Sequence, residues 1–182
     1  MVTGGARGCG LAFAQGLAEA GANIAIIDII EPSPAFESLP TMHKSYVADV
    51  SSLPSLRAAF SQFVADFGGK LDICVPCAGI NRNVSFLETG EEDFEALMGV
   101  NVKGVYYTAQ LAAKQMVANG TACGSIVVVA SIAAHMAVRS QQSSAYCATK
   151  GAVKAMVPAI AKELVGHVGV MSTSPSSEFV RD

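Results

Sequence analysis

The 182-residue sequence has little charge and no tryptophan, and these shortages exclude several classes of protein. Only 15% of the residues are charged and 51% are hydrophobic. This composition excludes a chain that is disordered as a whole, because such chains are rich in charge and poor in apolar residues. The net charge is −3 and no block of basic residues occurs, so we expect no nucleic-acid partner.

The sequence also lacks a membrane-length hydrophobic run, a signal-peptide pattern and a disulfide framework. The most apolar window, 125–138, is interrupted by Ser131 and His135 and falls short of the ~20 residues of a membrane helix, so no membrane partner is expected. The five cysteines form an odd set without framework spacing, which predicts free thiols in a reducing, cytoplasmic compartment. The three histidines lie far apart without ligand spacing, so no metal site is expected.

What the sequence does contain is an alternation of two kinds of segment. The β-branched runs 23–28, 44–47, 71–76 and 125–130 are apolar on successive residues, which is typical of parallel strands buried on both faces. Helical periodicity predicts helices over 9–20, 53–67, 91–99, 102–118 and 144–165, with a split near Asn101. Because 31–41 holds three prolines, we expect a loop there with at most a short turn. The alternation predicts a single α/β domain over 1–182, with a doubly wound, Rossmann-like parallel sheet in three layers.

A glycine-rich segment, 3–10, directly precedes the first predicted helix. Its glycines let the backbone turn tightly and approach a pyrophosphate, and the helix N-terminus supplies free N–H groups. A glycine-rich surface turn is the alternative on this motif alone. Asp28 lies 18 residues after Gly10, where a carboxylate can accept hydrogen bonds from ribose hydroxyls and repel a 2′-phosphate. Asp28 therefore slightly favours NAD over NADP, Arg7 argues weakly for NADP, and a strand-end turn is the alternative for Asp28.

Tyr146 and Lys150 are four residues apart in the last predicted helix and so share one face of it. A lysine ammonium near a phenol stabilises the phenolate and lowers a pKa that begins near ~10. The pair can then donate and accept protons near neutral pH. A tyrosine and a lysine four residues apart occur often enough by chance that the pair alone is weak evidence of a function. The glycine-rich segment earlier in the chain strengthens that evidence.

Together these motifs resemble the short-chain dehydrogenase/reductase family over almost the whole chain, from Thr3 to about Pro175. Segment 3–10 is similar to its TGxxxGxG loop, Asp49-Val50 resembles its adenine-contacting acidic pair, and Cys77-Ala78-Gly79 stands where the family has Asn-Ala-Gly. The resemblance implies a catalytic set of Asn101, Ser131, Tyr146 and Lys150. It also implies that NAD or NADP is bound by Gly4, Arg7, Gly8, Cys9, Gly10, Asp28, Asp49, Val50, Cys77, Ala78, Gly79, Asn101, Tyr146 and Lys150.

The implied activity is hydride transfer that interconverts an alcohol or polyol and a ketone. Tyr146 would protonate the forming alkoxide, Ser131 would bond the same oxygen, and Lys150 would hold the nicotinamide ribose. Asn101 would support a water that relays protons from Lys150. Ser131 lies 15 residues before Tyr146, farther than usual in the family, and the commoner spacing ends on Ala133, which has no hydroxyl. The longer spacing resembles fungal-type polyol and ketose reductases.

Several features depart from the family pattern. Cys74 and Cys77 spell C-x-x-C without a second pair, so we expect buried structural thiols. Only two residues precede Thr3, so the first strand is expected to be mostly missing and its neighbours to lose ladder partners. Segment 167–175 resembles a sixth strand and turn, 172–182 is expected to be irregular, and the family's last strand is absent. We therefore hypothesise a chain incomplete at both ends.

Two further functions and an assembly remain open from the sequence. A non-catalytic nucleotide-binding remnant is favoured by the short ends, and a Rossmann-type methyltransferase gives no reason for Tyr146 and Lys150. Segments 102–118 and 144–165 are apolar beyond one face. The resemblance implies that they form the interface of a homodimer or homotetramer, and simple packing on the sheet is the alternative.

Overall fold

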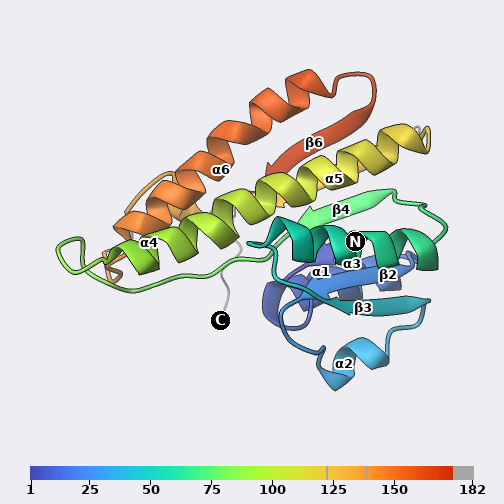
Figure 1. The fold of residues 1–182 in the computed structure, drawn as a ribbon, viewed down its shortest axis with the longest axis horizontal. Coiled ribbons are helices and arrows are strands. Elements are labelled where there is room, and N and C mark those ends of the chain that lie inside the picture. The colour runs from blue at the N-terminus through green and yellow to red at the C-terminus, as the bar shows by residue number, and fades with distance from the viewer. Residues whose placement is uncertain (122, 138, 174–182) are drawn as a thin grey trace.

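The computed structural model, which describes residues 1–121, 123–137 and 139–173, contains one parallel sheet with helices on both faces (Figure 1). Its strand order is β3-β2-β1-β4-β5-β6, and each neighbouring pair is parallel. The predicted doubly wound sheet is therefore confirmed. The strands are β1 (Val2–Thr3), β2 (Ile24–Asp28), β3 (His43–Val47), β4 (Ile73–Pro76), β5 (Gly124–Val129) and β6 (Val168–Thr173).

The helices follow the predicted periodic segments closely. The short α2 confirms the expectation of at most a turn in 31–41, and the split expected near Asn101 is a π-helix, Gly99–Gly104. A 3-10 turn, Ile132–Ala134, follows β5. The α-helices are α1 (Gly8–Glu19), α2 (Pro34–Glu37), α3 (Leu53–Asp66), α4 (Glu91–Met98), α5 (Val105–Ala118) and α6 (Ser144–Glu163).

Two hydrophobic clusters separate the layers of the molecule. The larger cluster joins α3, α5 and α6 to one face of the sheet, with Phe60, Ala109 and Val153 among its buried members. The smaller cluster joins α1 and α2 to the other face through Ala14 and Phe36. The predicted three-layer arrangement is confirmed, because α1 and α2 on one face and α3, α5 and α6 on the other bury apolar side chains against the strands.

The first strand is short but occupies the centre of the sheet. Val2 pairs with Ile26 of β2 on one side and with Val75 of β4 on the other. The loss of ladder partners expected for β2 and β4 therefore does not occur opposite Val2 and Thr3. The expectation of irregular structure from Ser172 onward is wrong for residues 172–173, which end β6 because they pair with β5. The expected turn near Pro175 lies outside the described residues.

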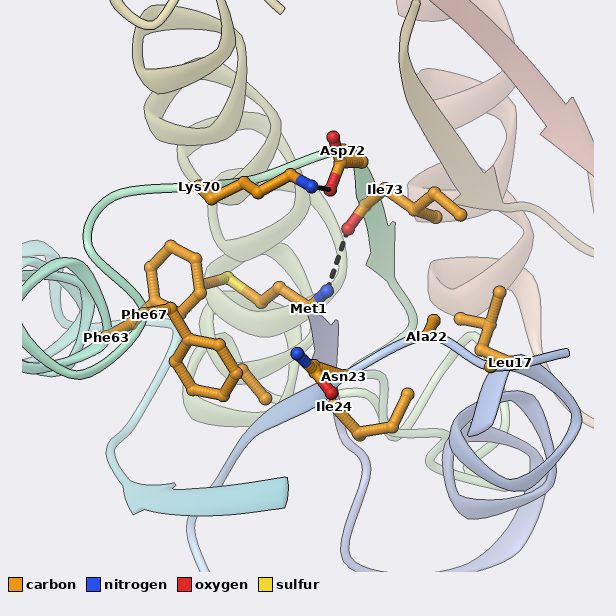
Figure 2. A pocket seen from close by; sticks show the side chains of 12 residues that line it. Met1, Leu17, Ala22, Asn23, Ile24, Phe63, Phe67, Lys70, Asp72 and Ile73 are labelled. Carbon is orange, nitrogen blue, oxygen red and sulfur yellow. Dashed lines mark hydrogen bonds and ion pairs between the residues drawn. The ribbon is translucent and has the colours of Figure 1, made fainter. Parts of the chain in front are cut away.

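A cavity of about 280 Å³ lies at the amino end of β1 (Figure 2). The Met1 amino group borders it and donates a hydrogen bond to the Ile73 carbonyl at 2.7 Å. Burial lowers the pKa of this amino group. The other edge of the sheet collects the carboxyl ends of the parallel strands, where ligands bind in open α/β sheets. The carboxyl ends of β1, β2, β4 and β5 therefore lie at the opposite edge of the sheet from this cavity.

Two glycines of α1 give a matched test of how tightly the first helix packs. A Cβ at Gly10 would lie 2.0 Å from the Gly4 carbonyl oxygen, whereas a Cβ at Gly16 would meet nothing within 4 Å. Gly10→Ala should lower the free energy of unfolding by about 1–3 kcal/mol, because the helix must shift away from the loop. Gly16→Ala should raise it by about 0.5–1 kcal/mol. Urea unfolding of both variants measures the difference, and equal effects would contradict the packing.

Candidate functional site

The glycine-rich loop between β1 and α1 packs directly on the segment that follows β4. Gly4 has a φ of +68°, and a Cβ there would lie 2.7 Å from the Ala78 Cα. The buried Thr3 hydroxyl oxygen accepts hydrogen bonds from the N–H groups of Cys77 and Ala78, each at 3.2 Å. The loop and the Cys77-Ala78-Gly79 segment, expected from the sequence to serve one ligand, are thus brought together.

The N-terminus of α1 fits an anionic group. Arg7 occupies the cap position, but its side chain makes no capping hydrogen bond, and the first turn contains no acidic residue. The first N–H groups of an α-helix have no partner within the helix, and the helix dipole favours a negative charge there. Gly8, Cys9 and Gly10 form this first turn, with Arg7, Gly8 and Cys9 exposed. These features match what the pyrophosphate of a dinucleotide requires.

Asp28 ends β2 beside this loop. Its Oδ2 accepts a hydrogen bond from the Ala6 N–H at 3.0 Å, and Oδ1 accepts one from the Ile29 N–H at 2.7 Å. The carboxylate therefore holds the glycine-rich loop as well as the turn after β2. The alternative of a strand-end turn residue describes part of its role, since Asp28 also bonds a loop 22 residues away.

Asp49 and Val50 follow β3 and differ in environment. The Asp49 carboxylate is exposed and accepts hydrogen bonds from the N–H and hydroxyl of Ser51 at 2.8 and 2.7 Å. Val50 is buried, and a Cβ on Gly104 of the π-helix would lie 2.8 Å from its Cγ2. Val50 thus supports the π-helix, while Asp49 faces solvent near the carboxyl edge of the sheet.

Asn101 is fully buried within the π-helix and is bonded to the loop after β4. Its Oδ1 accepts a hydrogen bond from the Ile80 N–H, and its Nδ2 donates to the Ile80 carbonyl, both at 2.9 Å. Nδ2 also donates to the Thr149 hydroxyl at 3.1 Å. A π-bulge commonly marks a functional position in a helix. Here the π-helix places the Asn101 side chain between the loop after β4 and α6.

Lys150 and Tyr146 share one face of α6, as their spacing predicts. The Lys150 Nζ donates a hydrogen bond to the Val129 carbonyl at the end of β5 at 3.0 Å and lies 5.8 Å from the centre of the Tyr146 ring. Burial lowers the pKa of the Lys150 amine, and negative charge on Cys77 would oppose that shift. A Cβ at Gly79 would lie 3.9 Å from Nζ, so the amine borders the Cys77-Ala78-Gly79 segment.

Ser131 lies two residues after β5 and caps the 3-10 turn, where its hydroxyl accepts a hydrogen bond from the Ala133 N–H at 3.2 Å. The alternative position, Ala133, is buried and has no hydroxyl. His135 ends the same turn, with its Nδ1 3.1 Å from the Lys154 Nζ on α6. The segment after β5 is thereby anchored at both ends, which leaves Ser131 half-buried at the carboxyl edge of the sheet.

Cys74 in β4 and Cys77 directly after it are free thiols; Cys74 is buried as expected, whereas Cys77 is only half-buried. Burial raises the pKa of Cys74 to about 11. Burial, together with charge on Cys9, raises the pKa of Cys77 to about 11. Both groups remain protonated near neutral pH, which is unfavourable for thiolate chemistry or metal binding. In the described ranges, no three His, Cys, Asp or Glu side chains are grouped so that they could hold a metal ion.

Sequence reasoning missed four groups that organise this site. They are the Thr3 hydroxyl, the backbone of Ile80, the Val129 carbonyl and the Thr149 hydroxyl. The two backbone groups carry no side-chain signal. The two threonines could have been noticed as polar residues beside the glycine-rich loop and between Tyr146 and Lys150.

No helix in the described part of the chain is long and apolar enough to span a membrane.

Comparisons with known proteins agree with this fold. Residues 1–177 match the family model of the short chain dehydrogenases. The chain is 32% identical to 2-dehydro-3-deoxy-D-gluconate 5-dehydrogenase of Escherichia coli (strain K12), covering 96% of this chain and 69% of the relative. It is 31% identical to a sorbose reductase of Schizosaccharomyces pombe, covering 96% and 71%. A gluconate 5-dehydrogenase from Burkholderia cenocepacia J2315, solved with NADP and tartrate, superposes with a TM-score of 0.80 at 34% identity, covering 94% and 67%.

The family match extends over nearly all of the chain, and it includes the glycine-rich loop, the π-helix and the Tyr146–Lys150 face. The chain belongs to the short-chain dehydrogenase family.

Proposed function

We propose that this protein is an NAD(P)-dependent oxidoreductase that interconverts an alcohol or polyol and a ketone. The observation that carries the proposal is that the segment after β4, the π-helix and α6 meet at one edge of the sheet. Asn101 Oδ1 and Lys150 Nζ both border Gly79, and Lys150 lies one helical turn from Tyr146. The family match favours this activity over the methyltransferase considered from the sequence.

The residues have distinct roles in this proposal. Tyr146 gives its hydroxyl proton to the substrate oxygen during reduction and takes it back during oxidation. Ser131 donates a hydrogen bond to the same oxygen and so orients the carbonyl. Lys150 holds the ribose of the cofactor and places its amine beside the phenol ring of Tyr146. Asn101 supports a water beside Lys150 that passes protons to solvent.

The cofactor site consists of the glycine-rich loop, the α1 N-terminus, Asp28, the Asp49-Val50 turn and the Cys77-Ala78-Gly79 segment. The uncapped first turn of α1 is the observation that fits a pyrophosphate. When bound, a nicotinamide dinucleotide supplies the hydride for reduction and accepts it in oxidation. The chain contributes orientation of the two reactants and the movement of the proton.

Sugar alcohols and ketoses are the proposed substrate class. The sorbose reductase and the gluconate-type dehydrogenases among the relatives support this class. The 15-residue interval between Ser131 and Tyr146 supports it independently. A panel of pentoses, hexuloses, tetritols and aldonic acids tests the class, with a 3-hydroxyacyl thioester as the competing chemistry. Turnover of the thioester alone would exclude the polyol proposal.

Tyr146→Phe should abolish the proton transfer and leave the cofactor site intact. We expect kcat to fall about 10²- to 10⁴-fold, because a positioned acid–base group contributes that much to the rate. NADH affinity, measured by nicotinamide fluorescence, should stay within about threefold, since that change is worth less than 1 kcal/mol.

Tyr107→Phe is the matched control, because it removes a phenol hydroxyl from α5, outside the site. It should keep the parental kcat. A Tyr146→Phe variant that turned over normally would contradict the proposed acid–base role. An unmodified chain that binds NADH without turning over any substrate would favour the nucleotide-binding remnant instead.

NAD is the proposed preferred cofactor, because the Asp28 carboxylate would repel a 2′-phosphate. Arg7 is exposed at the start of α1 and would attract the same phosphate. The Asp28 carboxylate is held in place by hydrogen bonds from the Ala6, Ile29 and Ile30 N–H groups. Its negative charge is therefore fixed beside the loop.

Asp28→Asn tests this preference by removing the negative charge while keeping one of the two oxygens that accept backbone N–H groups. The variant should bind NADPH about tenfold more tightly than the parent, the effect of relieving ~1.4 kcal/mol of repulsion. NADH affinity should change less. Fluorescence titration with both cofactors gives the four dissociation constants. Tighter binding of NADPH than NADH by the parent would overturn the proposed preference.

Self-association through α5 and α6 is also proposed, as a homodimer or homotetramer. Tyr106 and Val117 leave apolar surface on α5 that packing on the sheet does not cover, with exposed fractions of 42% and 47%. Exposed apolar helix faces of this kind are typical of interfaces between subunits. Free thiols at all five cysteines support the proposed cytoplasmic location.

Tyr106→Glu should shift the protein toward monomer, because it sets a charge in the centre of the proposed contact between two copies. Size-exclusion chromatography with light scattering measures the mass at several concentrations. The same substitution should leave the circular dichroism spectrum unchanged, since the side chain is exposed. A monomeric parent would exclude the assembly.

A further inference from the structure

Thr149 lies between the two proposed catalytic residues of α6 and is fully buried. Its hydroxyl takes part in two hydrogen bonds. Oγ1 donates to the Tyr146 carbonyl at 2.7 Å and accepts from the Asn101 Nδ2 at 3.1 Å. A hydroxyl has one proton and two lone pairs. Because the proton is used by the helix carbonyl, Oγ1 is left to Asn101 as an acceptor.

The Asn101 amide is held in one orientation by this acceptor and by Ile80. Both Nδ2 protons are used, one by Thr149 Oγ1 and one by the Ile80 carbonyl. Oδ1 accepts the Ile80 N–H. If the amide were turned over, Nδ2 would face the Ile80 N–H, and two donors would oppose each other. Oδ1 would then face the Ile80 carbonyl and Thr149 Oγ1, and acceptors would oppose each other at both. The side chain therefore has a single satisfied arrangement.

That arrangement directs the Asn101 Oδ1 toward the space that Lys150 also borders. A Cβ at Gly79 would lie 3.3 Å from Oδ1 and 3.9 Å from the Lys150 Nζ. Oδ1 has a second lone pair beyond the one that accepts the Ile80 N–H. The space thus has an acceptor on one side and an amine on the other, which suits a bridging water or a hydroxyl group.

We propose that Thr149 is a positioning residue, whose hydroxyl joins the catalytic turn of α6 to the π-helix and keeps Asn101 Oδ1 beside the Lys150 amine. The inference rests on the proposed function and deepens it. Thr149 does not touch the reacting atoms and acts through Asn101. Valine has nearly the same shape as threonine and cannot accept the Asn101 proton, whereas serine keeps the hydroxyl.

The test compares Thr149→Val, Thr149→Ser and a control, Thr108→Val. Thr108 is also fully buried, and its hydroxyl has no hydrogen-bond partner among the described residues. Steady-state kinetics use NADH and the best ketose of the panel. We expect Thr149→Val to lower kcat on the order of ten- to a hundredfold, the range expected when a buried donor loses its acceptor. KM and NADH affinity should change little.

Thr149→Ser should restore most of the lost kcat, and Thr108→Val should keep the parental value. Melting temperatures of all variants separate folding from catalysis. If Thr149→Val melts lower but keeps the parental kcat per folded molecule, the positioning role is wrong and Thr149 is only structural. If serine fails to rescue, the hydroxyl is not the group that matters, and the proposal is likewise overturned.

A second measurement separates this inference from the proposed activity. The side-chain amide of Asn101 gives a ¹⁵N–¹H signal in the NMR spectrum. This signal is assigned as the one that disappears in Asn101→Asp. Thr149→Val should shift this signal, while Thr149→Ser and Thr108→Val should leave it in place. The NMR measurement can be made even if the parent protein turns over no substrate. Lack of turnover would refute the proposed activity and would leave the positioning role to be decided by the NMR signal. An unshifted signal in Thr149→Val would refute the positioning role.

Discussion

The close contact between the loop after β1 and the segment after β4 is the constraint on which the carboxyl edge of the sheet depends. Two residues of β1 are enough to place this loop, because Val2 and Thr3 are buried between β2 and β4 and pair with both. Thr3 then bonds the next segment through its side chain, and Gly4 packs on Ala78 at a distance that no side chain would allow. The start of α1 and the β4 exit therefore form one surface.

A second layer of constraint comes from buried polar groups. Asn101, Thr149 and Lys150 are all buried, and each hydrogen-bonds a group on another element or in another turn. Buried polar groups are costly without partners, so such a network favours one arrangement over its alternatives. The network connects the π-helix, the loop after β4, the end of β5 and the Tyr146–Lys150 face of α6. It explains how residues far apart in sequence are held next to one another.

The sequence predicted the elements well where periodicity and breakers are strong. The apolar runs of β2 and β5 and the apolar stripe of α3 were identified nearly to the residue, because a continuous apolar run and a helical repeat of apolar residues are distinct sequence patterns. The prediction was weaker at the ends. A two-residue β1 pairs on both sides because its neighbours supply the hydrogen-bond partners, and residues 172–173 extend β6 for the same reason. Neither effect is local to the residues concerned.

By itself, the sequence determined the layered α/β fold, the glycine-rich start of α1 and the shared face of Tyr146 and Lys150. These follow from local chemistry: side-chain size, backbone freedom and the spacing of residues along a helix. Only the tertiary structure decided that Asp28 holds the glycine-rich loop, that Ile80 and Thr149 hold Asn101, and that the Lys150 amine bonds the end of β5. Those outcomes depend on backbone groups and on contacts across tens of residues, which residue types and spacing do not encode.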